Sequence, residues 1–244
     1  MIHSYFEAIR TLLDTVERTQ SAAMEQAAEQ VAKSIIDGGI IHLFGCGHSH
    51  ILTEEVFYRA GGLVPIRPIF YEPLMLHEGA VRSSALEREN GLGETFMEEQ
   101  DIRPGEVMFV LSTSGRNPVP VDVARIAKSK GAVTIGITSL AYSQSQPSRH
   151  VSGKHLYNSV DLVIDNHAAP GDAALRHPDV AVPFTPTSTV IGATILNSIL
   201  ARAIAIMAER GYEPPVFLSG NIDGADAHNA ACIARYQARI PLLA

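Results

Sequence analysis

The sequence predicts an α/β protein in which five parallel strands form one sheet with helices on both faces. Three observations support this. Five short apolar runs alternate with segments of helical periodicity, glycine-rich or hydroxyl-rich turns follow several of those runs, and 46% of the 244 residues are hydrophobic. Alternating strands and helices connect through right-handed crossovers, which make the strands parallel and cover both faces of the sheet. We therefore expect a doubly wound, three-layer α/β/α sandwich.

The elements follow in order along the chain. Residues 3–37 carry apolar side chains at helical spacing and end at Gly38 and Gly39, which predicts one long helix or two. Buried strands are predicted at residues 40–44, 64–71, 107–111, 132–138 and 161–165. Helices are predicted at residues 51–60, 86–99, 119–130 and 187–209. The tail from Pro214 has a proline-marked break, a short extended piece and a last helix that starts after Asp223 or Asp226.

We expect a single domain over residues 1–244, with an N-terminal helix (1–37), an α/β core (38–212) and a C-terminal tail and helix (213–244). The most apolar stretch, Thr189–Met207, is nearly long enough to span a bilayer, but Asn197, Ser198 and Arg202 interrupt it. It is therefore predicted to be a helix that is buried on most sides.

Composition argues against several classes of function. The formal charge is −7, and no cluster of Lys and Arg occurs along the chain, which argues against a nucleic-acid partner or an anionic membrane surface. The two cysteines, Cys46 and Cys232, cannot make a disulfide framework, and the first residues do not resemble a signal peptide. We expect a cytoplasmic protein.

The first strand ends in the sequence GCGHS, residues 45–49. Its two glycines permit a tight turn and a close approach to a ligand, and Ser49 can cap the helix that follows. Residue 50 is His50 where a dinucleotide-binding G-x-G-x-x-G turn requires glycine. Gly47, His48 and Ser49 are therefore candidates for binding something other than a dinucleotide.

Two later junctions are rich in hydroxyl groups. The third strand is followed by STSGRN, residues 112–117, and the long late helix opens with PTSTV, residues 186–190. In a parallel sheet these junctions meet at the carboxyl edge, where helix N-termini attract anions. The set predicts a pocket for a phosphate attached to a polyhydroxylated molecule, although each junction alone is also typical of ordinary caps and turns. The absence of a G-x-x-x-x-G-K-[ST] loop argues against nucleoside triphosphate hydrolysis.

These three motifs, in this order and spacing, resemble the SIS (sugar isomerase) phosphosugar-binding domain, over roughly residues 30–210. The chain looks most similar to stand-alone proteins related to phosphoheptose isomerases. The resemblance implies a flavodoxin-like five-stranded sheet, and a homodimer or homotetramer with its site at a subunit boundary. It also implies a set of phosphosugar-binding residues: Gly47, His48, Ser49, Ser112, Thr113, Ser114, Gly115, Asn117, Thr187 and Ser188.

The acid and base of such an isomerase are less clearly marked. Phosphoheptose isomerases place a glutamate ten residues after the first-loop serine, where this chain has Arg59. Glu72 follows the second strand, in a place similar to that of a carboxylate in a related isomerase domain. His228 resembles late histidines that open the sugar ring, sometimes from a neighbouring subunit, but its alternative is a surface histidine beside a helix. Glu54 and Glu55 lie near the start of the first core helix; Glu55 is a further catalytic candidate, although residues that face away from the sheet are more often solvated surface residues.

Ten histidines raise the question of a metal, but none has the H-E-x-x-H spacing of a zinc site, and neither cysteine belongs to a C-x-x-C pair. We expect neither a metal nor a cofactor. The leading hypothesis is a sugar-phosphate aldose-ketose isomerase. The alternatives are a non-catalytic phosphosugar sensor and an etherase or lyase that acts on an amino-sugar phosphate.

Overall fold

A computed structural model describes all residues, 1–244. Its central sheet contains β1 (Ile41–Gly45), β2 (Ile66–Pro68), β3 (Val107–Leu111), β4 (Val133–Thr138) and β5 (Leu162–Asp165). The strand order is β2-β1-β3-β4-β5, and every pairing is parallel. The predicted five-stranded parallel sheet is confirmed.

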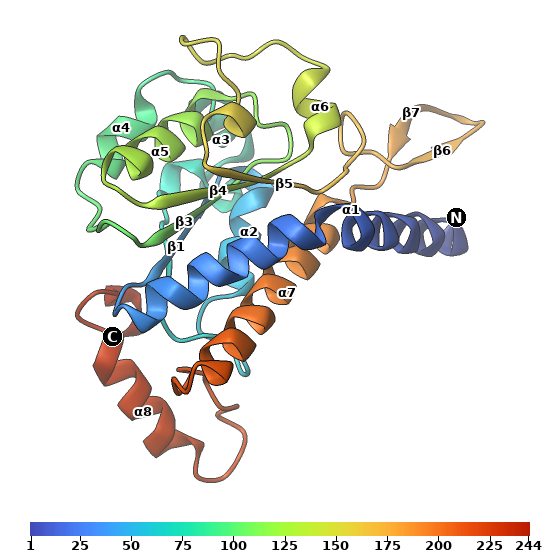
Figure 1. Cartoon of the computed structure of the whole chain (residues 1–244). Coiled ribbons are helices and arrows are strands. Elements are labelled where there is room, and N and C mark those ends of the chain that lie inside the picture. Colours follow the sequence, from blue (N-terminus) through green and yellow to red (C-terminus); the bar gives the residue numbers. More distant parts are fainter.

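Eight α-helices surround or extend the sheet (Figure 1): α1 (Ile2–Ile36), α2 (Ile51–Glu55), α3 (Ala80–Leu86), α4 (Leu92–Met97), α5 (Pro118–Ser129), α6 (Leu140–Gln144), α7 (Ser188–Glu209) and α8 (Ala225–Tyr236). The predicted helix at 51–60 ends early because Tyr58 takes a left-handed conformation, with φ of 44°. Of the helix predicted at 86–99, only α4 forms, because the preceding helix α3 ends at Leu86 and Gly91, with φ of 84°, turns the chain before α4 begins.

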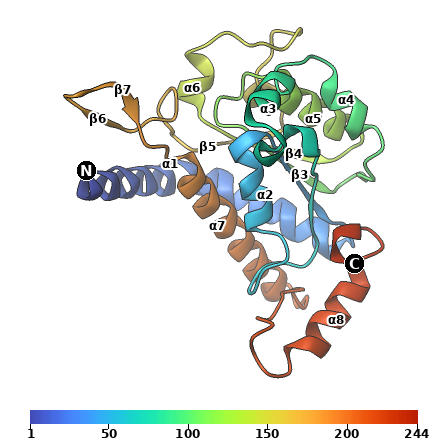
Figure 2. The same ribbon diagram turned by 180° about the vertical axis from the view of Figure 1, so that it is seen from behind.

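Side chains alternate between the two faces of the sheet. In β1, Ile41 and Leu43 face α1, α2 and α7, whereas Phe44 packs on the opposite side with residues of α4 and α5. Figures 1 and 2 show the sheet between these two helical layers. The three-layer architecture predicted from the sequence is therefore confirmed.

Helices α1 and α7 lie side by side along one face of the molecule (Figure 1). Two ion pairs, Arg202–Glu25 at 2.7 Å and Arg210–Glu29 at 2.5 Å, join them. Helix α7 is long and apolar enough to cross a membrane by length and composition, and half of its most apolar stretch is buried inside this chain. The prediction of a core helix that is buried on most sides therefore holds for only half of that stretch.

A hairpin of β6 (Leu175–His177) and β7 (Val180–Phe184), which the sequence analysis did not predict, stands between β5 and α7. It projects beside the N-terminal part of α1, as Figures 1 and 2 both show. Both strands are mostly exposed, so they lack the continuous apolar run that marks the buried strands.

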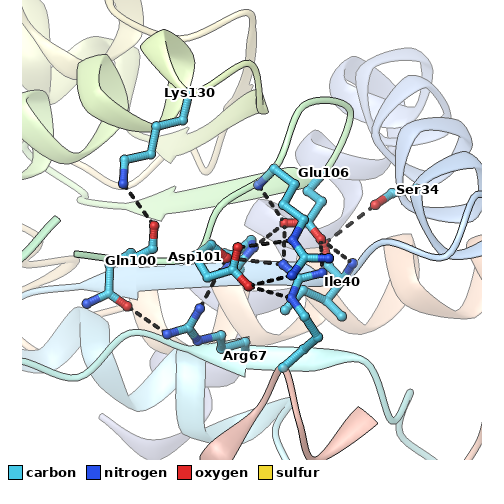
Figure 3. Close-up of polar contacts among 10 residues, drawn as sticks. Ser34, Ile40, Arg67, Gln100, Asp101, Glu106 and Lys130 are labelled. Atoms are coloured by element: carbon cyan, nitrogen blue, oxygen red, sulfur yellow. Dashed lines mark hydrogen bonds and ion pairs between the residues drawn. The ribbon is translucent and has the colours of Figure 1, made fainter. Parts of the chain in front are cut away.

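The C-terminal tail packs near the amino ends of the strands. Phe217 and Tyr236 share a small core with Ile40 and Val64, which directly precede β1 and the β2 region. Figure 3 shows the polar contacts beside this core. Arg239 of the tail donates two hydrogen bonds to the Glu106 carboxylate, at 2.9 and 3.1 Å. An ion network thus attaches the tail to the amino edge of the sheet.

Glu106 is the centre of that network and is only 2% exposed. Its carboxylate also accepts hydrogen bonds from His42 Nε2 at 2.9 Å and from the backbone of Ile40 and Arg103 at 3.1 and 2.9 Å. Burial by itself would raise the pKa of Glu106, but the hydrogen bonds from His42, Arg239 and Arg103 outweigh it and lower the pKa to about 2. The buried carboxylate is therefore ionised and fully compensated.

Candidate functional site

The candidate site lies at the carboxyl edge of the sheet, where β1 and β3 end side by side. Gly45 of β1 is in register with Leu111 of β3, so the loops that follow the two strands begin next to each other. The fold therefore brings together the first two hydroxyl-rich or glycine-rich junctions found in the sequence.

The first loop folds back over the end of its own strand. A Cβ on Gly45 would lie 2.6 Å from the backbone of Ser49, so only glycine fits there, and Gly47 has a left-handed φ of 54°. His48 is exposed and Ser49 half-buried. Cys46 is buried, and burial together with the charge of Glu87 raises the pKa of its thiol, which opposes a role as a nucleophile.

The second loop, residues 112–117, is held by its carbonyl groups. The carbonyl of Thr113 accepts from Ser139 N at 2.9 Å, that of Ser114 from Ser143 Oγ at 2.8 Å, and that of Gly115 from Leu156 N at 2.8 Å. A Cβ on Gly115 would lie 2.7 Å from Ser143 Oγ, so this position also requires glycine. The loop is fixed from one side, against the β4–α6 region.

The opposite groups of the same loop remain free. The backbone N–H groups of Thr113, Ser114 and Arg116 have no acceptor within the chain, whereas the N–H of Gly115 bonds to Ser112 Oγ at 3.3 Å. Most backbone N–H groups in folded proteins are paired, so neighbouring free donors are informative. Together with the hydroxyl of Ser114, they can bind an anion such as a phosphate.

The start of α7 differs from the sequence-based expectation. Asp172 places its carboxylate there and accepts hydrogen bonds from the backbone N–H and the hydroxyl of both Thr187 and Ser188, at 2.5–3.3 Å. Thr187 and Ser188 were predicted to face a sugar phosphate. In this structure a carboxylate of the chain itself occupies those donors, because an anion at a helix N-terminus is stabilised by the helix dipole.

The acid and base candidates lie in three different places. Glu72 begins a 3-10 turn after β2, is exposed and has no side-chain partner. The segment that follows it reaches the first loop, since a Cβ on Gly47 would lie 3.9 Å from Leu76. Glu55 pairs with Arg59 and lies 3.4 Å from Asn197 of α7. The segment that Glu72 begins therefore reaches the candidate site, whereas Glu55 is engaged by Arg59.

His228 does not reach the candidate site within one chain. It lies on α8, where its Nε2 is 2.8 Å from the carbonyl oxygen of Val216 and 3.6 Å from Cys232 Sγ. Helix α8 packs near the amino ends of the strands, at the other end of the sheet. A catalytic role for His228 requires a second subunit, and it stays a prediction.

The structure adds a carboxylate that sequence reasoning missed. Glu87 follows α3 and is half-buried, and its backbone carbonyl accepts from Val119 N of α5 at 3.4 Å. Burial raises the pKa of Glu87, and the Asn117 side chain and the charges of Arg88 and Arg149 offset this only in part. A carboxyl group with a raised pKa beside a candidate site can hold or transfer a proton. Its place 19 residues after the end of β2 gave no sequence signal.

Three arginines also gather beside the second loop. Arg149 Nη1 donates to Asn117 Oδ1 at 2.9 Å, Arg149 N donates to the carbonyl of Arg116 at 2.9 Å, and Arg116 Nε donates to the carbonyl of Pro147 at 3.1 Å. Arg88 is the third. No cluster of basic residues exists along the sequence, but folding creates one. The only signal in the sequence was Arg116, inside the STSGRN motif.

Comparisons with known proteins agree with this architecture. The sequence model of a family described as "SIS domain" matches residues 4–139. A UPF0309 protein of Halalkalibacterium halodurans is 68% identical over 244 residues, which cover 100% of this chain and 98% of the relative. A UPF0309 protein of Geobacillus kaustophilus is 64% identical over 243 residues, which cover 100% of this chain and 97% of the relative.

Solved structures show the same fold at low sequence identity. A phosphoheptose isomerase from Francisella tularensis is similar with a TM-score of 0.54 and 16% identity, over 83% of this chain and 95% of that chain. The phosphoheptose isomerase GmhA from Neisseria gonorrhoeae gives a TM-score of 0.52 and 15% identity, over 85% of this chain and 97% of that one. At these identities the similarity establishes the fold alone.

Proposed function

Because the chain belongs to the SIS domain family, we propose that it binds a sugar phosphate at the carboxyl edge of the sheet. The observation that carries this proposal is the second loop, where the N–H groups of Thr113, Ser114 and Arg116 are free while the carbonyls are turned toward β4 and α6. The phosphate lies on these donors, and the sugar extends toward the first loop at Gly47, His48 and Ser49. Thr187 and Ser188 donate their hydrogen bonds to Asp172 instead.

We propose further that the protein is an aldose-ketose isomerase. Such an enzyme moves a proton between two adjacent carbons through an enediol, which requires a carboxylate that can alternately accept and donate that proton. Glu72, at the end of β2, and Glu87, between the two loops, are the candidates. Burial raises the pKa of Glu87, which favours a carboxyl group that can hold a proton.

A specific observation favours a second candidate function, that of a phosphosugar sensor without catalysis. Glu55 pairs with Arg59, and His228 lies at the opposite end of the sheet, so one chain does not bring His228 to Glu72. A binding protein needs only the loops. The etherase or lyase alternative would use the same loops with a different placement of acid and base.

Three further expectations stay predictions: a homodimer or homotetramer, a cytoplasmic location, and the absence of nucleic-acid and membrane partners. The groove between α1 and α7, with a volume of about 380 Å³ and lined by Leu13, Val16 and Ile195 among others, is where a second copy would bury apolar surface. If a second copy binds in this groove, the arrangement of the two chains also determines whether the neighbouring chain can supply His228.

The proposal is tested by measuring the affinity of hexose and heptose phosphates by calorimetry for the parent and for Ser114→Ala. We expect parent binding that weakens about tenfold in Ser114→Ala, because a hydroxyl donor to a charged group is lost. Ser145→Ala is the matched control, since its hydroxyl donates only to the carbonyl of Tyr142. Equal affinities in all three proteins, or no binding to any sugar phosphate, would contradict the proposal.

Catalysis is tested separately with the sugar phosphates that bind. Incubation with the parent, Glu72→Gln and Glu87→Gln, followed by detection of the ketose product, separates the isomerase from the sensor. We expect at least one of the two variants to lose about a hundredfold or more in rate. Tight binding without any product in the parent would favour the sensor.

A further inference from the structure

We propose that Arg88, Arg116 and Arg149 form a second anion subsite beside the phosphate-binding loop, so that the preferred ligand is a sugar phosphate with a second anionic group. This inference rests on the proposed function, because the loop at residues 112–117 must hold the first phosphate. It goes further by naming the chemical class of the sugar: a phosphorylated sugar acid, or a sugar with two phosphates.

The three arginines come from separate segments that meet around the second loop. Arg88 follows α3, Arg116 lies within the loop itself, and Arg149 belongs to the segment between α6 and the next strand. The contact between Arg149 Nη1 and Asn117 Oδ1, at 2.9 Å, fixes one guanidinium at the end of the loop. Arg88 and Arg149 are exposed and Arg116 is half-buried, so their charges are accessible to a ligand.

None of these arginines forms an ion pair with a carboxylate of the chain. Elsewhere Arg59, Arg103, Arg202, Arg210 and Arg239 each have such a partner. Nine of the fifteen arginines of the chain lack such a partner, but the fold brings these three close enough for their charges to interact. Charges that the fold does not compensate are available for an anion from solution.

The charged groups around the cluster leave an excess of positive charge. Partial burial and the like charges of Arg116 and Arg88 lower the pKa of Arg149, whereas Glu87 and Tyr142 raise it. Glu87 is the one carboxylate among these neighbours, and a single negative charge does not compensate three guanidinium groups. The arginines repel one another, and an added anion relieves that repulsion.

Separate donors argue for two anionic groups rather than one. The free N–H groups of Thr113 and Ser114 lie at the start of the loop, whereas Arg149 is anchored at its end through Asn117. Arg88 comes from a separate segment that follows α3. Guanidinium groups bind carboxylates and phosphates alike through paired hydrogen bonds. The cluster therefore requires a negative charge on the second group of the ligand. That group can be a carboxylate or a phosphate.

The test compares matched ligands by calorimetry. Fructose 6-phosphate is paired with fructose 1,6-bisphosphate, and glucose 6-phosphate with 6-phosphogluconate, so that one arm adds a phosphate and the other a carboxylate. We expect the second anion to tighten binding about tenfold or more in at least one arm. In Arg88→Gln, that gain falls to about threefold, while the affinity for the monophosphate changes by less than about threefold.

The control is Arg125→Gln, which removes a guanidinium on α5 that already faces Asp122 at 3.9 Å, and it should retain the gain. If Arg88→Gln weakens both members of a pair equally, Arg88 contributes to binding of the first phosphate and the inference is wrong. If the monophosphates bind and the second anion adds nothing, the inference fails while the proposed function stands. If no sugar phosphate binds the parent, both fail.

Discussion

The two edges of the sheet differ in whether their charged side chains have partners of opposite charge. At the amino edge, Glu106 is buried and accepts hydrogen bonds from Arg239, His42 and backbone N–H groups, so its charge is fully compensated. At the carboxyl edge, Arg88 and Arg149 have no ion-pair partner. Buried charge is therefore compensated at the amino edge, whereas guanidinium groups at the carboxyl edge lack a carboxylate partner, beside the loop where we propose that a ligand binds.

The amino edge is also where the C-terminal tail is attached. Arg239 reaches Asp101 at 2.8 Å as well as Glu106, and Arg67 donates to the backbone carbonyl of Asp101 at 3.2 Å (Figure 3). Removing one partner of such a buried network leaves an uncompensated charge, which costs far more than losing a surface ion pair. Substitutions at this edge should therefore affect folding, and those at the carboxyl edge should affect binding.

The largest expected effect is that of Glu106→Gln. The substitution removes the buried carboxylate that His42 and Arg239 share and leaves Arg239 with Asp101 alone, so we expect the free energy of unfolding to fall by about 4 kcal/mol. Glu99→Gln, an exposed site nearby in sequence, should change it by less than about 0.5 kcal/mol. Urea denaturation measures both. A loss of sugar-phosphate affinity in folded Glu106→Gln protein would mean that the two edges are not independent.

The pH dependence of stability sharpens the same comparison. The pKa of Glu106 is about 2 in the folded protein, below its ordinary value of 4.5, so its contribution is present above pH 4.5 and is lost as the pH falls toward 2. Burial lowers the pKa of His42 from 6.5, so protonation of the unfolded chain begins to destabilise the fold below that pH.

We therefore expect parent stability to fall in two stages, below pH 6.5 and again below pH 4.5, with the second stage amounting to about 3 kcal/mol. Urea denaturation at a series of pH values measures this. Glu106→Gln should weaken the second stage, because the residue that titrates there has been removed. An unchanged second stage in that variant would assign the acid sensitivity to other carboxylates.

The sequence predicted the sheet well because its signal is local. A strand buried on both faces must be apolar throughout, and Val107–Leu111 was found with its observed bounds for this reason. The two glycine-containing loops were predicted for a similar reason, since Gly45 and Gly115 each have backbone or side-chain atoms where a Cβ would lie. Short-range constraints of this kind can be recognised from a single sequence, without comparison to related sequences.

The remaining features depend on contacts between distant residues. Arg88, Arg116 and Arg149 are separated by about thirty residues at each step, and only the packing of α3 and α6 beside the second loop brings them together. Asp172 lies 15 residues before Thr187, across a hairpin whose exposed strands gave no apolar signal. Nothing in the local pattern could indicate that the hydroxyl groups of α7 already have a partner.

The smallest expected effect concerns that partner. Asp172→Asn keeps the shape of the side chain and suits the left-handed φ of 50°, but it removes the charge at the start of α7. We expect the free energy of unfolding to fall by about 1 kcal/mol, whereas Asp179→Asn, on the exposed turn of the hairpin, should change it little. Sugar-phosphate affinity should stay the same, because the phosphate lies on residues 112–117. A tenfold change in affinity would instead place Thr187 and Ser188 within the site, and the carboxyl edge would then contain an internal anion that competes with the ligand.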